Sequence, residues 1–153
     1  MRLKTFTDYS LRLLIFLAAT PQRRATIAEI ADAFDISEAH LMKVSHTLGK
    51  AGVLANVRGK GGGLKLAMAP AAINLGYIVR LTEGVPRPAA CFEGAGACRI
   101  ERVCILRSVL DDAVTAFYAV LDRYTLEDIA RNRNGLARTL ALPASIRVTP
   151  RSG

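Results

Sequence analysis

Apolar residues near the start of the chain recur with the spacing of helices that each bury one face. Between residues 27 and 34 they fall at i, i+3, i+4 and i+7, which predicts a short helix capped by Thr26. Residues 37–50 carry a similar stripe, with polar and cationic residues on the opposite side. An apolar run over residues 7–19 predicts an earlier buried helix, with Thr7 as its cap and Asp8 in its first turn.

A strand pattern follows these three helices. Two short runs, about residues 53–58 and 64–68, flank a glycine-rich turn, which predicts a β-hairpin. The order helix, helix, turn, helix, hairpin is typical of a winged helix–turn–helix. We assign this domain to residues 1–83, with a closing helix that begins near Asn74.

The second half of the chain contains a longer apolar repeat. From residue 105 to about 124, apolar positions are spaced alternately by four and three residues, a heptad seam that usually meets another helix. We therefore assign residues 105–131 to a dimerisation helix and a short final helix capped by Thr125. The fold class is mainly α with a small β-hairpin. The tail, residues 132–153, is basic and lacks a sustained period, so we expect it to be partly disordered.

Composition adds a partner to this picture. The 153 residues carry a net charge of +8 with a pI near 9.9, which favours nucleic acid as partner before a membrane surface. No run approaches the ~18 apolar residues of a membrane span. Asp8 and Arg12 interrupt the apolar N-terminal stretch, which favours a buried helix over a secretory signal. No catalytic arrangement stands out, so we do not expect an enzyme.

Several polar residues are placed to contact DNA. Side chains that reach base edges lie at the start of the second helix of a helix–turn–helix pair. The hairpin tip, "RGKGGG", carries cations on a backbone that can approach DNA closely, and a helix N-terminus can donate to a phosphate. The candidate DNA contacts are Thr26, Ser37, Glu38, His40, Lys43, Arg58 and Lys60. The alternative for His40, and for His46, is an ordinary surface position.

All three cysteines lie in one loop, residues 84–104. Their pattern, C-x6-C-x5-C, has wider gaps than the C-x2–4-C pairs of most zinc sites. Wide gaps suit an iron–sulfur cluster, whose separate irons each need one thiolate. An odd, clustered set of cysteines also argues against disulfides and for reduced thiols, hence a cytoplasmic protein. We therefore predict a metal site made of Cys91, Cys98 and Cys104.

Three thiolates leave one position of a four-iron cluster to fill. No histidine follows His46, so the ligand would be a carboxylate, solvent or a small molecule. The carboxylates include Glu93, Glu101 and the distant Asp8, and the residues alone leave this choice open. Oxygen is a harder ligand than iron–sulfur chemistry prefers, so this iron would be the one a small reactive gas attacks first. Alternatives are a zinc- or thiol-based DNA-binding regulator, a basic interaction module and a cluster carrier.

Taken together, these segments resemble the family of winged-helix iron–sulfur regulators that includes NsrR and IscR. The matching pieces are "LKTFTDYSLRLLIFLA", "TIAEIADAFDISEAHLMKVSHTLGKAGVLANVRGKGGGLKLA", "INLGYIVRLTEG" and the cysteine loop, which together span residues 1 to about 130. The resemblance implies a homodimer in which each long helix crosses its partner. It also implies binding to a palindromic operator in double-stranded DNA.

Two positions distinguish branches of this family. IscR-like members have a histidine three residues after the last cysteine, where this chain has Arg107. The NsrR-like pattern implies that Asp8 of one subunit ligates the cluster held by the other subunit's cysteines. It further implies one 4Fe–4S cluster per subunit, with 2Fe–2S as the alternative, in a repressor that releases DNA when nitric oxide nitrosylates the cluster. The alternative is an IscR-like regulator of cluster biogenesis.

Overall fold

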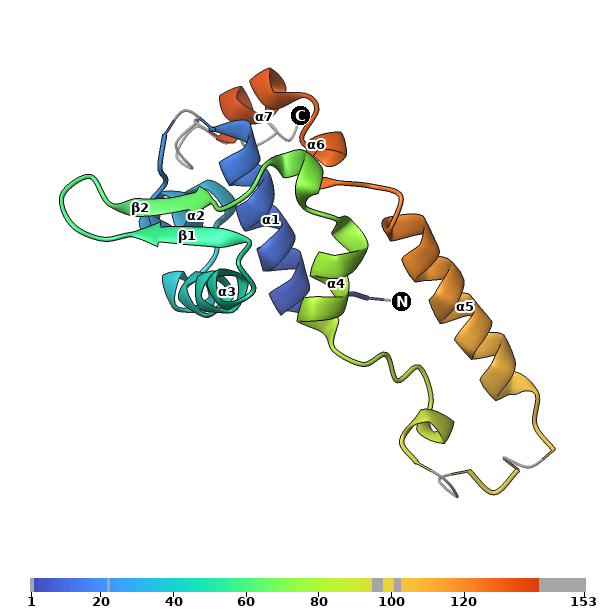
Figure 1. The fold of residues 1–153 in the computed structure, drawn as a ribbon. Helices are drawn as coiled ribbons and strands as arrows, with labels where there is room; N and C mark the ends of the chain where they lie inside the picture. Colours follow the sequence, from blue (N-terminus) through green and yellow to red (C-terminus); the bar gives the residue numbers. More distant parts are fainter. Residues whose placement is uncertain (1, 22, 95–97, 101–102, 141–153) are drawn as a thin grey trace, which may run out of the picture.

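The computed structural model describes residues 2–21, 23–94, 98–100 and 103–140 (Figure 1). Its elements, in chain order, are α1 (Thr5–Ala19), α2 (Ile27–Phe34), α3 (Glu38–Lys50), β1 (Leu54–Val57), β2 (Gly63–Leu66), η1 (Pro70–Ala72), α4 (Leu75–Glu83), η2 (Ala90–Phe92), α5 (Leu106–Leu121), α6 (Leu126–Ile129) and α7 (Arg133–Leu140). The mainly helical fold with one small hairpin is confirmed.

The core is built around α1. This helix packs against α2, α3, α4, α6, α7 and strand β2. Its Leu13 and Leu14 are completely buried, as are Ile30 of α2 and Leu41 and Leu48 of α3. The apolar stripes read from the sequence therefore face one another, as an amphipathic helix requires when it folds against its neighbours.

The helix starts follow the predicted caps with one exception. Thr26 and Thr125 each form a capping box, and the Asn74 side chain accepts a hydrogen bond from the Tyr77 N–H. Helix α1 instead begins at Thr5, two residues before the predicted start. Thr7 does not cap it, because Thr7 is fully buried and its own N–H donates to the Lys4 carbonyl at 2.9 Å, within the first turn.

The hairpin is tied to the rest of the domain by the segment before α2. Strands β1 and β2 are antiparallel, with Leu54 opposite Leu66. Ala25 exchanges two backbone hydrogen bonds with Leu64, of 3.1 and 2.7 Å. Gly63 permits this approach, because a Cβ at that position would lie 2.8 Å from the Ala25 carbonyl oxygen. The wing is thus extended by one residue pair into the α1–α2 connection.

An ion pair joins α4 to the residue that directly follows the long helix α5. Arg80 donates to both carboxylate oxygens of Asp122, at 2.6 and 2.7 Å, and its guanidinium lies 4.3 Å from the centre of the Tyr118 ring. A Cβ at Gly76 would lie 1.9 Å from the Asp122 carboxylate, so this contact requires glycine there. Elsewhere α5 is largely uncovered: Leu106 and Val109 are more than half exposed.

The start of the C-terminal tail differs from the expectation. The sequence predicts a tail without sustained helical period and partly disordered from residue 132, whereas residues 133–140 form α7, which packs on α1. Leu136 and Leu140, one turn apart, rest on the core. Two apolar residues are too few to reveal a helical period, so only the contact with α1 explains this helix. Residues 141–153 lie outside the described part of the chain.

The Arg80–Asp122 pair gives a pH-dependent prediction. The hydrogen bonds and charge of Arg80 lower the pKa of Asp122. The carboxylate therefore contributes stability above its unfolded pKa of about 3.9, and this contribution is lost as the pH falls through the lower folded value. Asp122→Asn should be less stable than the wild type at pH 7, and the gap should close towards pH 3. Urea unfolding at matched protein concentration measures it, and a gap that does not change with pH would contradict the assignment.

Candidate nucleic-acid interface and cysteine loop

The outer face of α3 presents the predicted base-contacting residues. Ser37, Glu38, His40 and Lys43 are all exposed, whereas Leu41, Val44 and Leu48 on the opposite side are buried. Ser37 precedes the helix with an extended backbone but makes no capping hydrogen bond. Its hydroxyl can therefore serve an outside partner. The arrangement gives one protruding helix face of the kind that enters a major groove.

The wing stands beside this helix and is coupled to it. Arg58 and Lys60 are exposed in the turn between the strands. The Ser45 hydroxyl of α3 donates to the Asn56 side-chain oxygen of β1 at 3.3 Å. This hydrogen bond ties the hairpin to the helix that carries the candidate base contacts.

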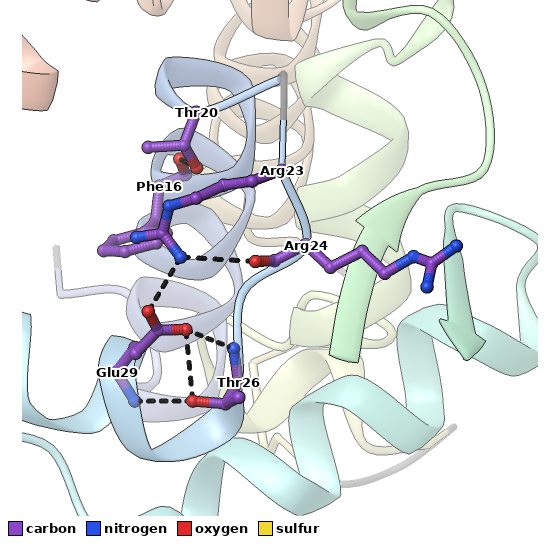
Figure 2. Close-up of polar contacts among 6 residues, drawn as sticks. All are labelled: Phe16, Thr20, Arg23, Arg24, Thr26 and Glu29. Carbon is purple, nitrogen blue, oxygen red and sulfur yellow. Dashed lines mark hydrogen bonds and ion pairs between the residues drawn. The ribbon is translucent and has the colours of Figure 1, made fainter. Parts of the chain in front are cut away.

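Thr26 is more constrained than the sequence suggests. Its backbone N–H donates to the Glu29 carboxylate at 2.7 Å, and its hydroxyl lies 3.2 Å from the same oxygen (Figure 2). The Thr26 N–H bond, together with Arg23, lowers the pKa of Glu29 and keeps this carboxylate charged. A phosphate at Thr26 would have to displace Glu29, so the predicted contact carries an energetic cost.

The cysteine loop connects α4 to α5. Cys91 lies in the short helix η2, and Cys91, Cys98 and Cys104 are all half-buried free thiols. The Leu106 N–H donates to the Cys104 sulfur at 3.4 Å. The Arg107 guanidinium lies 5.6 Å from the Phe92 ring centre, and so joins the turn that carries Cys91 to the start of α5.

The chemistry of these side chains suits an iron-containing cofactor. The candidate ligands are soft thiols, and hydrogen bonds to ligand sulfurs are one of the features by which proteins tune iron–sulfur centres. Of the local carboxylates, Glu93 is exposed and Glu101 lies outside the described residues. Within the described part of the chain, no three His, Cys, Asp or Glu side chains converge as a metal site.

Asp8 lies on α1 with a different partner. Its carboxylate pairs with the Arg12 guanidinium at 2.9 Å, and Arg12 also lies 5.8 Å from the Phe34 ring centre of α2. The pair lines a hollow of about 520 Å³ beside Tyr9, and no cysteine is among the described lining residues. One chain by itself therefore does not bring Asp8 to the three thiols.

Comparison with known proteins places the chain in a family. The model for "Rrf2: Iron-dependent Transcriptional regulator" matches residues 3–132. This chain belongs to the Rrf2 family. It is 44% identical over 144 residues to the HTH-type transcriptional regulator NsrR of Bacillus subtilis, covering 93% of this chain and 99% of that protein. The NsrR of Geobacillus kaustophilus is also 44% identical, covering 92% and 97%.

Solved structures agree on the architecture. CymR (YrzC), the global cysteine regulator of B. subtilis, matches with a TM-score of 0.70 and 29% identity, over 86% of this chain and 98% of that one. T. potens IscR matches with a TM-score of 0.68 and 26% identity, over 86% and 88%. The chain is accordingly a winged-helix, DNA-binding transcription regulator rather than an enzyme. Over its described residues, no helix has the length and apolarity to cross a membrane.

The sequence analysis did not predict the polar contacts that two arginines make in the structure. Arg12 holds Asp8, and the signal for this was their i, i+4 spacing on a predicted helix. Arg24 donates to the carbonyl of Gly61, 37 residues away, in the wing turn. No local pattern predicts a contact of that separation.

The position of Lys60 in the wing turn predicts an electrostatic role. Lys60→Ala should weaken DNA binding on every sequence and lower the dependence of log Kd on log salt by about one, because one counterion fewer is released. Fluorescence anisotropy over a salt series measures this change. Lys50→Ala, which removes an equal charge at the far end of α3, is the matched control. An unaltered salt dependence would exclude a phosphate contact at Lys60.

Proposed function

We propose that this protein is an iron–sulfur-dependent transcriptional repressor that releases operator DNA in response to nitric oxide. One observation carries the proposal. Three half-buried free thiols lie on the loop that leads into the exposed helix α5, in a chain of an iron-dependent regulator family. Its 44% identity to NsrR proteins, and the Arg107 that stands where IscR-like members have histidine, favour the NsrR-like alternative.

The three cysteines would hold the cofactor, and Asp8 of the partner subunit would complete the set. A bound 4Fe–4S cluster would supply an iron centre that reacts with nitric oxide. Asp8 offers an oxygen, which is a weak ligand for such iron and leaves that position open to exchange. The Arg12 side chain competes for the same carboxylate, since the two now lie 2.9 Å apart. Ligation by Asp8 would therefore replace its ion pair with Arg12 by a bond to iron.

The uncovered face of α5 supports a homodimer. Leu106, Val109, Val120 and Tyr124 are each at least 46% exposed, and they lie on or beside the heptad seam. An apolar seam of this kind is normally buried against a second helix. A symmetric dimer would place two α3 helices in successive major grooves, about 34 Å apart, on a palindromic operator in the cytoplasm.

The cysteine loop would couple the cofactor to DNA. It joins α4, which packs on α1, to α5, which would set the distance between the two subunits. Without the metal the three thiols would no longer be held together, so α5 and the two DNA-binding domains could change their relative position. A hundredfold change in operator affinity would require a coupling free energy of about 3 kcal/mol.

Anaerobic purification tests the cofactor and the signal together. The wild type should contain bound iron and acid-labile sulfide, and nitric oxide titration should release it from operator DNA. Cys98→Ala should lose both the iron and the tight operator binding while remaining folded, because two thiolates cannot hold the cluster. Colourless protein with stoichiometric zinc would support a zinc-stabilised regulator instead. Metal-free protein that binds its operator tightly would overturn the proposal.

The role of Asp8 has a separate test. Asp8→Ala should retain iron through the three cysteines but change the absorption and circular dichroism spectra and the rate of reaction with nitric oxide. Glu93→Ala is the matched control, because Glu93 is an exposed carboxylate within the cysteine loop itself. A changed spectrum in Glu93→Ala and an unchanged one in Asp8→Ala would assign the ligand to the loop.

A further inference from the structure

A basic hollow lies between the α1–α2 connection and the wing, beside the wing turn and strand β2. It has a volume of about 550 Å³ and is open to solvent. Its described lining residues are Pro21, Arg23, Arg24, Gly61, Gly62 and Lys65. None of these described residues is a carboxylate, and three of them carry cationic side chains.

Arg24 supplies an available positive charge to this hollow. Its Nη1 donates to the Gly61 carbonyl oxygen at 3.0 Å, which orients the guanidinium against the wing turn. A carbonyl is neutral and engages one of the five guanidinium N–H groups, so the charge and most donors remain free. Within the described residues Arg24 has no acidic partner. Lys65 on β2 is exposed and likewise lacks an ion-pair partner there.

The neighbouring Arg23 has a different environment. It pairs with Glu29 at 2.7 Å and also donates to the Arg24 carbonyl oxygen at 3.2 Å. Figure 2 shows the two side chains leaving the backbone in opposite directions, Arg23 towards Glu29 and Arg24 towards the wing. Glu29 thus neutralises Arg23, whereas the charge of Arg24 is left for an outside anion.

The backbone around the hollow is held firmly. The two Ala25–Leu64 hydrogen bonds fix the chain directly after Arg24 to strand β2. A Cβ at Gly62 would lie 2.4 Å from the Val57 carbonyl oxygen, so the turn is closed tightly on itself. The distance between Arg24 and the wing is therefore set by main-chain contacts and needs little rearrangement when an anion binds.

We propose that this hollow is a binding site for a phosphate of the DNA backbone, gripped by Arg24 and Lys65. It deepens the proposed function and rests on it, because the wing must lie on DNA for the site to be used. The hollow adjoins the turn that exposes Arg58 and Lys60. A DNA strand whose phosphates contact those two side chains would therefore continue into the hollow. A planar guanidinium suits the paired oxygens of a phosphodiester.

The test measures binding of the full-length protein to a mixed-sequence DNA duplex by fluorescence anisotropy over a salt series. Arg24→Ala and Lys65→Ala should each weaken binding by about fivefold and lower the salt dependence by about one. Arg24→Gln keeps an N–H donor for the Gly61 carbonyl but removes the charge, so it should behave like Arg24→Ala. Arg123→Ala, which removes the same charge in the turn after α5, should change neither quantity appreciably.

The outcomes separate this site from its alternatives. Weaker binding with an unchanged salt dependence in Arg24→Ala would mean that Arg24 only positions the wing, and would overturn the proposal. So would equal behaviour of Arg24→Ala and Arg123→Ala. Inorganic phosphate that displaces DNA at constant ionic strength, and does so only when Arg24 is present, would support the proposal, because free phosphate and the DNA phosphate would then compete for the hollow. If Arg24→Ala loses its fold by circular dichroism, Lys65→Ala decides.

The proposed function fails by a different result. A wild-type protein that binds no DNA duplex at any salt concentration would remove the DNA-binding role as a whole. If the wild type binds DNA with a clear salt dependence, and the Arg24 and Lys65 variants bind with the same affinity and salt dependence as the wild type, only the proposed phosphate site is removed.

Discussion

The burial of α1 is the constraint on which the rest of the structure depends. Helices from both halves of the chain pack on it, including α2 and α3 of the DNA-reading pair and α6 and α7 near the C-terminus. Its inner face is mostly apolar and buried, and it contributes to the hydrophobic core that the domain shares. Its N-terminal half carries the polar residues Asp8 and Arg12 on the outer side, so core and candidate site share one rigid element.

This arrangement places α1 in contact with the reading helices in two ways. Arg12 lies over the Phe34 ring of α2, and the Tyr9 ring lies 5.9 Å from the His40 ring of α3. Arg12 and Tyr9 of α1 therefore lie next to the helix pair that carries the candidate DNA contacts.

The wing and α5 illustrate how sparse contacts position functional surfaces. The polar contacts that hold the wing include the backbone pair with Ala25, the Ser45–Asn56 hydrogen bond and the Arg24–Gly61 hydrogen bond, while Arg58 and Lys60 in its turn remain exposed. Helix α5 is held by Arg80 and Asp122 at one end and leaves most of its apolar seam open. In both cases specific polar contacts attach the element to the domain, and its remaining surface stays exposed to a partner.

The sequence by itself determined most of the helices and their caps, and the hairpin, because apolar spacing and capping residues act over only a few positions. Thr26, Asn74 and Thr125 all cap as their local patterns predict. The three cysteines and their spacing also pointed to metal chemistry without a structure. Tertiary structure alone decided which charges are neutralised and which remain available. Arg23 and Arg24 are identical side chains in adjacent positions, and only their contacts with Glu29 and Gly61 distinguish them. Helix α7 likewise forms where the local period is too weak to predict it, because its two leucines find a surface on α1.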